Sequence, residues 1–222
     1  MREEFIIIRA KSLGTRGGGP TLSPASGGRL PLEDFTVEID RLEHSAAQRA
    51  RSLAEVYEIA NVLPLKLIRP VETGNPPHDP TAVPTEQWGL RAVGALQSPF
   101  SGVGTTVAVL DTGIDQCHPS FDGVELLQKN FTNEGPEDRD GHGTHRAATI
   151  FGRDFNHTRI GVARGVQRAL IGKVIGKDGG NTAGIFEAIL RAVNEGANVL
   201  SMSLGIDFPG YQRRLTEAGL PQ

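Results

Sequence analysis

The stretch VAVLDTGID, residues 107–115, decides the fold of this chain. It begins as a nearly continuous apolar, β-branched run, which is typical of a strand buried on both faces of a parallel sheet. The runs at 169–175 and 197–202 share this character. Between them, apolar residues at helical spacing predict a helix over 182–194. A strand, a helix and a strand in this order predict a right-handed βαβ unit, and therefore an α/β fold.

The aspartate within the opening stretch, Asp111, follows directly after the predicted strand. In an open parallel sheet, ligands and catalytic groups gather beyond the carboxyl ends of the strands. Asp111 therefore occupies the position of a catalytic carboxylate. An aspartate at such a place is, on its own, more often a turn former or a helix cap.

A second motif, DGHGTH at residues 140–145, precedes a helix-compatible stretch. The glycines on either side of His142 keep the backbone slim, so an imidazole at the start of a helix is open to close approach. His142 and His145 stand three residues apart, which also suggests a metal-dependent hydrolase as an alternative. No glutamate lies between them as in HExxH, so we expect no metal site.

Together, VAVLDTGID, DGHGTH and SMSLG (201–205), in this order, resemble the subtilisin-like serine protease (subtilase) family. The resemblance implies that Asp111 is the catalytic aspartate and that His142 is the general base of an Asp–His–Ser triad. It also implies two walls of a peptide groove, one formed by Ser203, Leu204 and Gly205 and the facing one by Gly179, Gly180 and Asn181. The expected fold is a partial subtilisin-like parallel sheet with flanking helices.

The serine of the triad has no counterpart in the sequence. In the order Asp, His, Ser of subtilisin, the serine follows the histidine by roughly 155 residues, whereas 80 residues follow His142 in this chain of 222. We therefore expect a subtilisin-like serine endopeptidase, acting on peptides or proteins, that is truncated before its serine and inactive as this chain alone. The alternatives are a non-catalytic pseudoprotease and a propeptide-type inhibitor or chaperone of a full-length relative. A complementing chain is a further possible partner.

Three residues depart from the family pattern. Arg146 replaces a small or apolar residue, so its guanidinium must reach solvent or a carboxylate if the helix is to stay undistorted. Ser120 stands where calcium-binding relatives have an aspartate ligand, so we expect neither calcium nor another cofactor. The one cysteine, Cys117, is expected to be a small packed residue and not a second nucleophile.

The residues before the α/β pattern predict a separate unit. Residues 1–72 resemble the small α+β propeptide domain of the family, with a strand, a loop, a strand, a helix and a closing strand at 5–9, 10–28, 35–42, 46–59 and 64–71. The polar, proline-rich residues 73–87 predict a linker, in which the resemblance implies self-cleavage before Trp88. Residues 88–222 would then be the N-terminal part of a catalytic domain. An unrelated accessory domain is the alternative for residues 1–72.

Composition excludes several classes of partner. The net charge is −3, and no basic lobe exists for nucleic acid or an anionic membrane. No apolar run approaches the ~20 residues of a membrane span. The apolar run at 5–8 is too short for a signal peptide. The sequence therefore favours a cytoplasmic protein, with secretion as the alternative.

Overall fold

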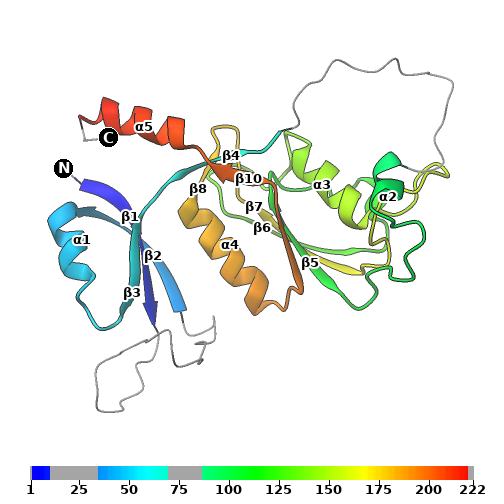
Figure 1. The fold of residues 1–222 in the computed structure, drawn as a ribbon, viewed down its shortest axis with the longest axis horizontal. Coiled ribbons are helices and arrows are strands. Elements are labelled where there is room, and N and C mark those ends of the chain that lie inside the picture. Colours follow the sequence, from blue (N-terminus) through cyan, green and yellow to red (C-terminus); the bar gives the residue numbers. More distant parts are fainter. Residues whose placement is uncertain (1, 11–34, 70–86, 220–222) are drawn as a thin grey trace, which may run out of the picture.

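The computed structural model describes residues 2–10, 35–69 and 87–219 (Figure 1). Most of the predicted loop at 10–28 and nearly all of the predicted linker at 73–87 lie outside these residues. Within them, no helix is long and apolar enough to cross a membrane.

A parallel sheet forms the centre of the larger part of the chain. Its strand order is β6-β7-β5-β9, with β5 at Thr106–Asp111, β6 at Glu125–Asn130, β7 at Arg168–Lys173 and β9 at Val199–Met202. Helix α4 (Thr182–Asn194) connects β7 to β9. The predicted α/β class and βαβ unit are therefore confirmed. Short helices α2 (Trp88–Ala92), η2 (Pro119–Phe121) and α5 (Phe208–Glu217) complete this part.

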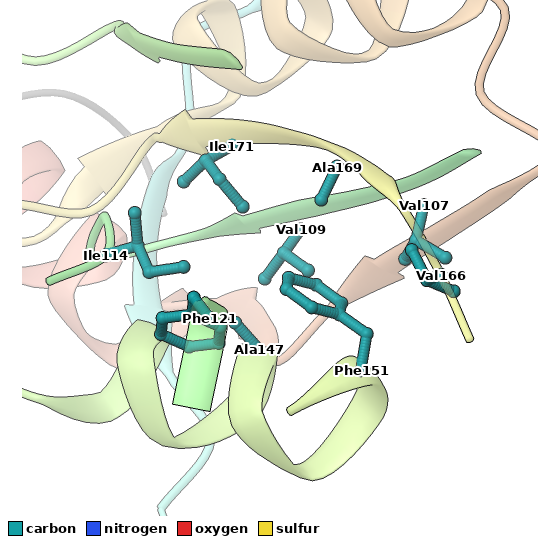
Figure 2. Packing of buried hydrophobic residues seen from close by; sticks show 9 residues of the cluster. All are labelled: Val107, Val109, Ile114, Phe121, Ala147, Phe151, Val166, Ala169 and Ile171. Atoms are coloured by element: carbon teal, nitrogen blue, oxygen red, sulfur yellow. The ribbon is translucent and has the colours of Figure 1, made fainter. Parts of the chain in front are cut away.

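Both faces of the sheet are covered, because successive side chains of a strand point to opposite faces. One face packs on helix α3 (His142–Phe151) through Val107, Val109, Ala169, Ile171, Ala147 and Phe151 (Figure 2). The alternate residues Ala108, Leu110 and Leu170 join the clusters that contain Ala188 and Ala192 of α4. The central strands thus have the two buried faces that their sequence predicts.

Strand β9 departs from that prediction. Val199 is 50% exposed and Met202 is 45% exposed. Within the described residues β9 lies at the edge of the sheet and has β5 as its neighbour. The expectation that this strand is buried on both faces is therefore wrong for the described residues.

The N-terminal residues form a separate antiparallel sheet. Strand β1 (Arg2–Ala10) lies between β2 (Phe35–Glu43) and β3 (Val56–Asn61). One face packs on α1 (His44–Ala50) through Phe5, Ile7, Ala47 and Ile59. The other face packs on α4, where Ile6 and Val62 contact Ala183 (Figure 1). Helix α4 is thus covered by one sheet on each side.

The predicted helix at 46–59 is wrong in its second half. Helix α1 ends at Ala50, and residues 56–61 form β3. Leu53 and Tyr57, which would share one face of a helix over 46–59, are 46% and 55% exposed. The β-branched and aromatic residues of this stretch favour a strand, and pairing with β1 buries Ile59 completely.

The predicted closing strand at 64–71 lies in a different place. Strand β4 (Pro64–Leu67) leaves the N-terminal sheet and enters a third sheet, of order β10-β4-β8. Its neighbours are β10 (Leu204–Ile206) and β8 (Gly180–Asn181). A strand of the N-terminal part is therefore built into the α/β part.

Candidate active site

Asp111 and His142 form a buried pair at the carboxyl end of the parallel sheet. Asp111 is the last residue of β5, and His142 is the first residue of α3. His142 Nδ1 lies 2.7 Å from Asp111 Oδ1, and their side chains are 8% and 2% exposed. A carboxylate at one ring nitrogen fixes the tautomer of the imidazole, so that the other nitrogen is free to act as a base. The structure thus brings together the two residues proposed from the sequence as catalytic.

A second carboxylate, Asp138, holds the two segments that carry this pair. The Thr112 hydroxyl donates a hydrogen bond to Asp138 (2.8 Å) and accepts one from the Gly143 backbone N–H (2.9 Å). Asp138 also accepts hydrogen bonds from the backbone and hydroxyl of Thr144 (2.9 and 2.6 Å) and from the Gly141 N–H (2.9 Å). The exit of β5 and the start of α3 therefore meet at one carboxyl group.

The hydrogen bonds to Asp138 change its acidity. Burial raises the pKa of this carboxyl, but the hydrogen bonds from Thr144, Gly141 and Thr112 outweigh that effect and lower the pKa below its ordinary value. Asp138 is not among the residues proposed from the sequence. The signal was an acidic residue just before a helix start, where carboxylates satisfy free backbone N–H groups.

The glycines of both motifs allow the close approach of α3 to β5. A Cβ atom on Gly143 would lie 2.2 Å from the backbone oxygen of Gly113. Gly113 and the N-cap Gly141 have φ values of +105° and +84°, which a residue with a side chain adopts only with strain. Gly143 is thus required by the contact between two backbones, which differs from the access for the imidazole expected from the sequence.

All residues predicted for the groove walls lie beside β4. On one side, Ser203 O accepts a hydrogen bond from Ile68 N (3.0 Å), and Leu204 and Gly205 pair with Leu67 and Lys66. On the other side, Gly180 and Asn181 pair with Leu65 and Pro64. The neighbouring Gly179 is so close that a Cβ on it would lie 2.8 Å from Leu65 O. The extended segment between the two walls is the chain's own β4, and the role of these walls in binding a substrate stays a prediction.

The end of this segment reaches the Asp111–His142 pair. The carbonyl oxygen of Ile68 lies 3.3 Å from His142 Nε2, the ring nitrogen that Asp111 leaves free. The peptide bond between Ile68 and Arg69 therefore lies against the candidate base. Leu65, three residues earlier, is 4% exposed and packs in the core with Leu110 and Ile175, which anchors the segment.

A buried lysine, Lys173, contacts the loop at residues 134–137, near the Asp111–His142 pair. Lys173 lies beside Asp111 in the register of β5 and β7 and is 2% exposed. Its ammonium donates to Glu137 O (2.8 Å) and lies 3.3 Å from Glu134 Oε2. The hydrogen bond from the Lys177 backbone is the largest cause that lowers the pKa of Glu134. The hydrogen bond from Lys173 lowers it further, whereas burial acts in the opposite direction. A cavity of about 730 Å³ remains between this loop and β4.

The three residues that depart from the family pattern differ in their burial and in their hydrogen-bond partners. Arg146 is half-buried, and its Nε is buried without a hydrogen-bond partner in the described residues, yet α3 runs unbroken. Ser120 is buried and lies 2.7 Å from His118 Nδ1. Cys117 is exposed, so the expectation of a packed residue is wrong. The reason is a turn in which its N–H bonds to Asp115 Oδ1 (3.0 Å).

No cluster of metal ligands accompanies the second histidine of the motif. His145 is exposed on α3, and His142 is taken up by its contacts with Asp111 and Ile68. In the part of the chain that the structure describes, no group of three or more His, Cys, Asp or Glu residues could hold a metal ion. The arrangement thus gives no support to the metal-dependent alternative.

Comparisons with known proteins show which family this chain is similar to. The model of the subtilase family (Peptidase_S8) matches residues 102–218. Similar proteins include a subtilisin-like protease 6 from Trichophyton schoenleinii, 35% identical over 139 residues, which are 53% of this chain and 33% of that protein. A subtilisin-like protease 1 from Arthroderma gypseum is 36% identical over 135 residues, 53% of this chain and 27% of its own length. The chain spans about a third of the length of the curated relatives that it matches.

Proposed function

This chain belongs to the subtilase family, and on that premise we propose that it is the Asp- and His-bearing part of a subtilisin-like serine endopeptidase. The observation that carries the proposal is the buried contact of 2.7 Å between His142 and Asp111, beside a groove that holds an extended peptide segment. The serine would come from sequence outside these 222 residues. The length of the relatives supports this, since the aligned part covers 33% of the first one. Peptides and proteins are the proposed substrates.

In the proposed mechanism, His142 Nε2 takes the proton of the serine hydroxyl as the serine attacks the peptide carbonyl, and later gives it to the leaving amine. Asp111 holds the imidazole by Nδ1 and stabilises the charge that forms on the ring. Both roles agree with the burial of the pair, because a water-excluded carboxylate interacts more strongly with the imidazolium. The walls at 179–181 and 203–205 would hold the substrate backbone as two flanking strands.

A second candidate function is autoinhibition by the N-terminal residues. It is favoured by the contact of 3.3 Å between Ile68 O and His142 Nε2, which blocks the nitrogen that would accept the proton. In this function, residues 1–68 act as a propeptide that fills the groove until it is cut. The register supports self-cleavage between Ile68 and Arg69, earlier in the chain than the linker position before Trp88.

Processing of a precursor that includes the downstream sequence tests both functions. We expect a fragment that begins at Arg69, no processing in His142→Ala, and processing slowed by about 10⁴-fold in Asp111→Asn, the loss that the equivalent change causes in another serine protease. A fluorophosphonate probe should label the processed enzyme and leave the 222-residue chain unlabelled. Equal processing in His142→Ala would refute the protease proposal. Failure of residues 1–68 to inhibit the processed enzyme at micromolar concentration would refute autoinhibition.

A further inference from the structure

Two basic side chains of the segment in the groove meet carboxylates on either side of Ile68. Lys66 Nζ lies 3.1 Å from Asp207 Oδ1, and Arg69 Nη2 lies 2.5 Å from Asp140 Oδ2. Asp207 directly follows β10, and Asp140 precedes His142 by two residues. Asp207 therefore flanks one wall of the groove, Asp140 lies beside the candidate base, and each cation belongs to the segment that occupies the groove.

The backbone register determines which side chain meets which carboxylate. Lys66 pairs with Gly205, and Ile68 N bonds to Ser203 O. A different peptide held by the same bonds would present its own side chains at the same places. The two acidic residues therefore face fixed positions of any occupant: the third residue before the bond at His142, and the first residue after it.

The carboxylates are more buried than the cations that they bind. The side chains of Asp207 and Asp140 are 24% and 33% exposed, against 57% for Lys66 and 60% for Arg69. The hydrogen bond from Lys66 is the main reason why the pKa of Asp207 is lowered. In each ion pair the carboxylate is thus the less exposed partner and the basic side chain the more exposed one.

Other cations near Asp140 have acidic partners of their own. Lys173 lies 3.3 Å from Glu134, and Arg139 lies 3.9 Å from Glu137. Glu134 also accepts a hydrogen bond from the Lys177 backbone (2.6 Å). Asp140 therefore has Arg69 as its ion-pair partner in the described residues.

We propose that Asp207 and Asp140 are specificity-determining residues, which select a basic residue at the third position before the cleaved bond and a basic residue directly after it. This inference rests on the proposed protease function. It names the substrate class: peptides with two cations that bracket an apolar pair. Both pairs are solvent-accessible, so each preference is about 2- to 5-fold, the range of exposed ion pairs.

The precursor, once processed, tests the selection with internally quenched peptides of the form Leu-X-Leu-Ile-Z-Pro, in which X is Lys or Gln and Z is Arg or Gln. We expect kcat/KM to be about 2- to 5-fold higher for each basic residue. Asp207→Asn should remove the preference at X alone, and Asp140→Asn that at Z alone. Asp154→Asn, a control in an exposed pair with Arg164, should leave both preferences. Unchanged preferences in the two groove variants would overturn the proposal.

Hydrogen exchange of the Ile68 amide in the 222-residue chain tests the pairing without catalysis. Asp140→Arg should speed this exchange by about 2- to 5-fold, and adding Arg69→Asp should restore it by exchanging the charges. If no peptide is cleaved but exchange follows this pattern, the protease proposal fails and the charge selection stands. Exchange that is equal in the parent and both variants would show that Asp140 does not hold the segment, and would refute the selection after the cleaved bond.

Discussion

The Thr112 hydroxyl donates a hydrogen bond of 2.8 Å to Asp138, and this contact joins the end of β5 to the start of α3. The same hydroxyl accepts the N–H of Gly143, the residue after His142. Asp111 and His142 are thus held together by their own contact and by a second link between their neighbours. The second link is tested by changing it without touching the pair.

Thr112→Val should destabilise the chain by about 1–3 kcal/mol. Valine keeps the shape of the side chain but leaves the buried Gly143 N–H without its acceptor and removes one of the hydrogen bonds to Asp138. A buried donor without a partner is the costly way to lose a hydrogen bond. Chemical unfolding at pH 7 measures the effect. Thr112→Ser is the matched control, which retains the hydroxyl and loses only a methyl group, worth about 0.8 kcal/mol. Equal losses in the two variants would contradict a role for the hydroxyl.

The contribution of Asp138 to stability should depend on pH. Its pKa is lowered in the folded state from an ordinary value of 3.8, so the unfolded chain binds the proton more tightly. The contribution is therefore fully present above that ordinary value and is lost as the pH falls through the lower folded value. The difference in unfolding free energy between the parent and Asp138→Asn should stay constant from pH 7 to about pH 5 and shrink below pH 4. A difference that grows on acidification would disprove this.

Gly143→Ala should be disruptive although alanine favours helices. The new Cβ would lie 2.2 Å from Gly113 O, a backbone atom that cannot rotate away. We expect a loss of about 1–3 kcal/mol, as for other overpacked sites, and a displaced His142 ring. Gly89→Ala is the control, since nothing lies within 4 Å of its Cβ position in α2. Melting temperatures and the His142 ring NMR signals compare the two variants, and a neutral Gly143→Ala would argue against the close contact.

Leu65→Ala should release β4 from the groove. Leu65 is 4% exposed in the core, and such truncations typically cost about 2–5 kcal/mol. Ile68→Ala, at a residue that is 58% exposed, should change stability by less than about 0.5 kcal/mol. Hydrogen exchange of the β4 amides separates local release from global unfolding. Full protection of the β4 amides in Leu65→Ala would show that the backbone pairing alone holds β4 in the groove, and would contradict the anchoring role of Leu65.

Arg146→Met should stabilise the chain. The buried Nε of Arg146 has no hydrogen-bond partner in the described residues, and an unsatisfied buried group costs about 1–3 kcal/mol. Methionine places an apolar methyl group where Nε stands and has no polar atom that needs a partner. Thermal unfolding of the two chains measures the gain. A lower melting temperature for the variant would mean that the guanidinium has a stabilising contact.

The sequence predicted the features that depend on local pattern. The apolar run that ends at Asp111 and the spaced apolar residues of 182–194 each determine one element, and their order determines the βαβ unit. The residues from 46 to 59 satisfy both a helical and an extended pattern, and pairing with β1 decided in favour of β3. Tertiary pairing of this kind overrides a weak local preference.

The site was predictable only where its residues stand in motifs. Asp111 and His142 lie in distinctive sequences, whereas Asp138 acts through hydrogen bonds to five different groups that no spacing reveals. The position of β4 between β8 and β10 could not be predicted from the sequence either. Pro64–Leu67 looks like any short strand, and only the folded chain shows that its partners are Gly180–Asn181 and Leu204–Ile206.

The sheet of β10, β4 and β8 has a consequence for the order of folding. Its middle strand is made early in synthesis, and both of its neighbours come much later in the chain. Long loops must close, at a cost in conformational entropy, before these strands form their hydrogen bonds. Pairings between residues so far apart in sequence therefore form slowly. The N-terminal sheet, whose strands are near neighbours in sequence, has no such delay. The groove and its occupant are therefore expected to assemble in one late step, on a scaffold that has already folded on either side of α4.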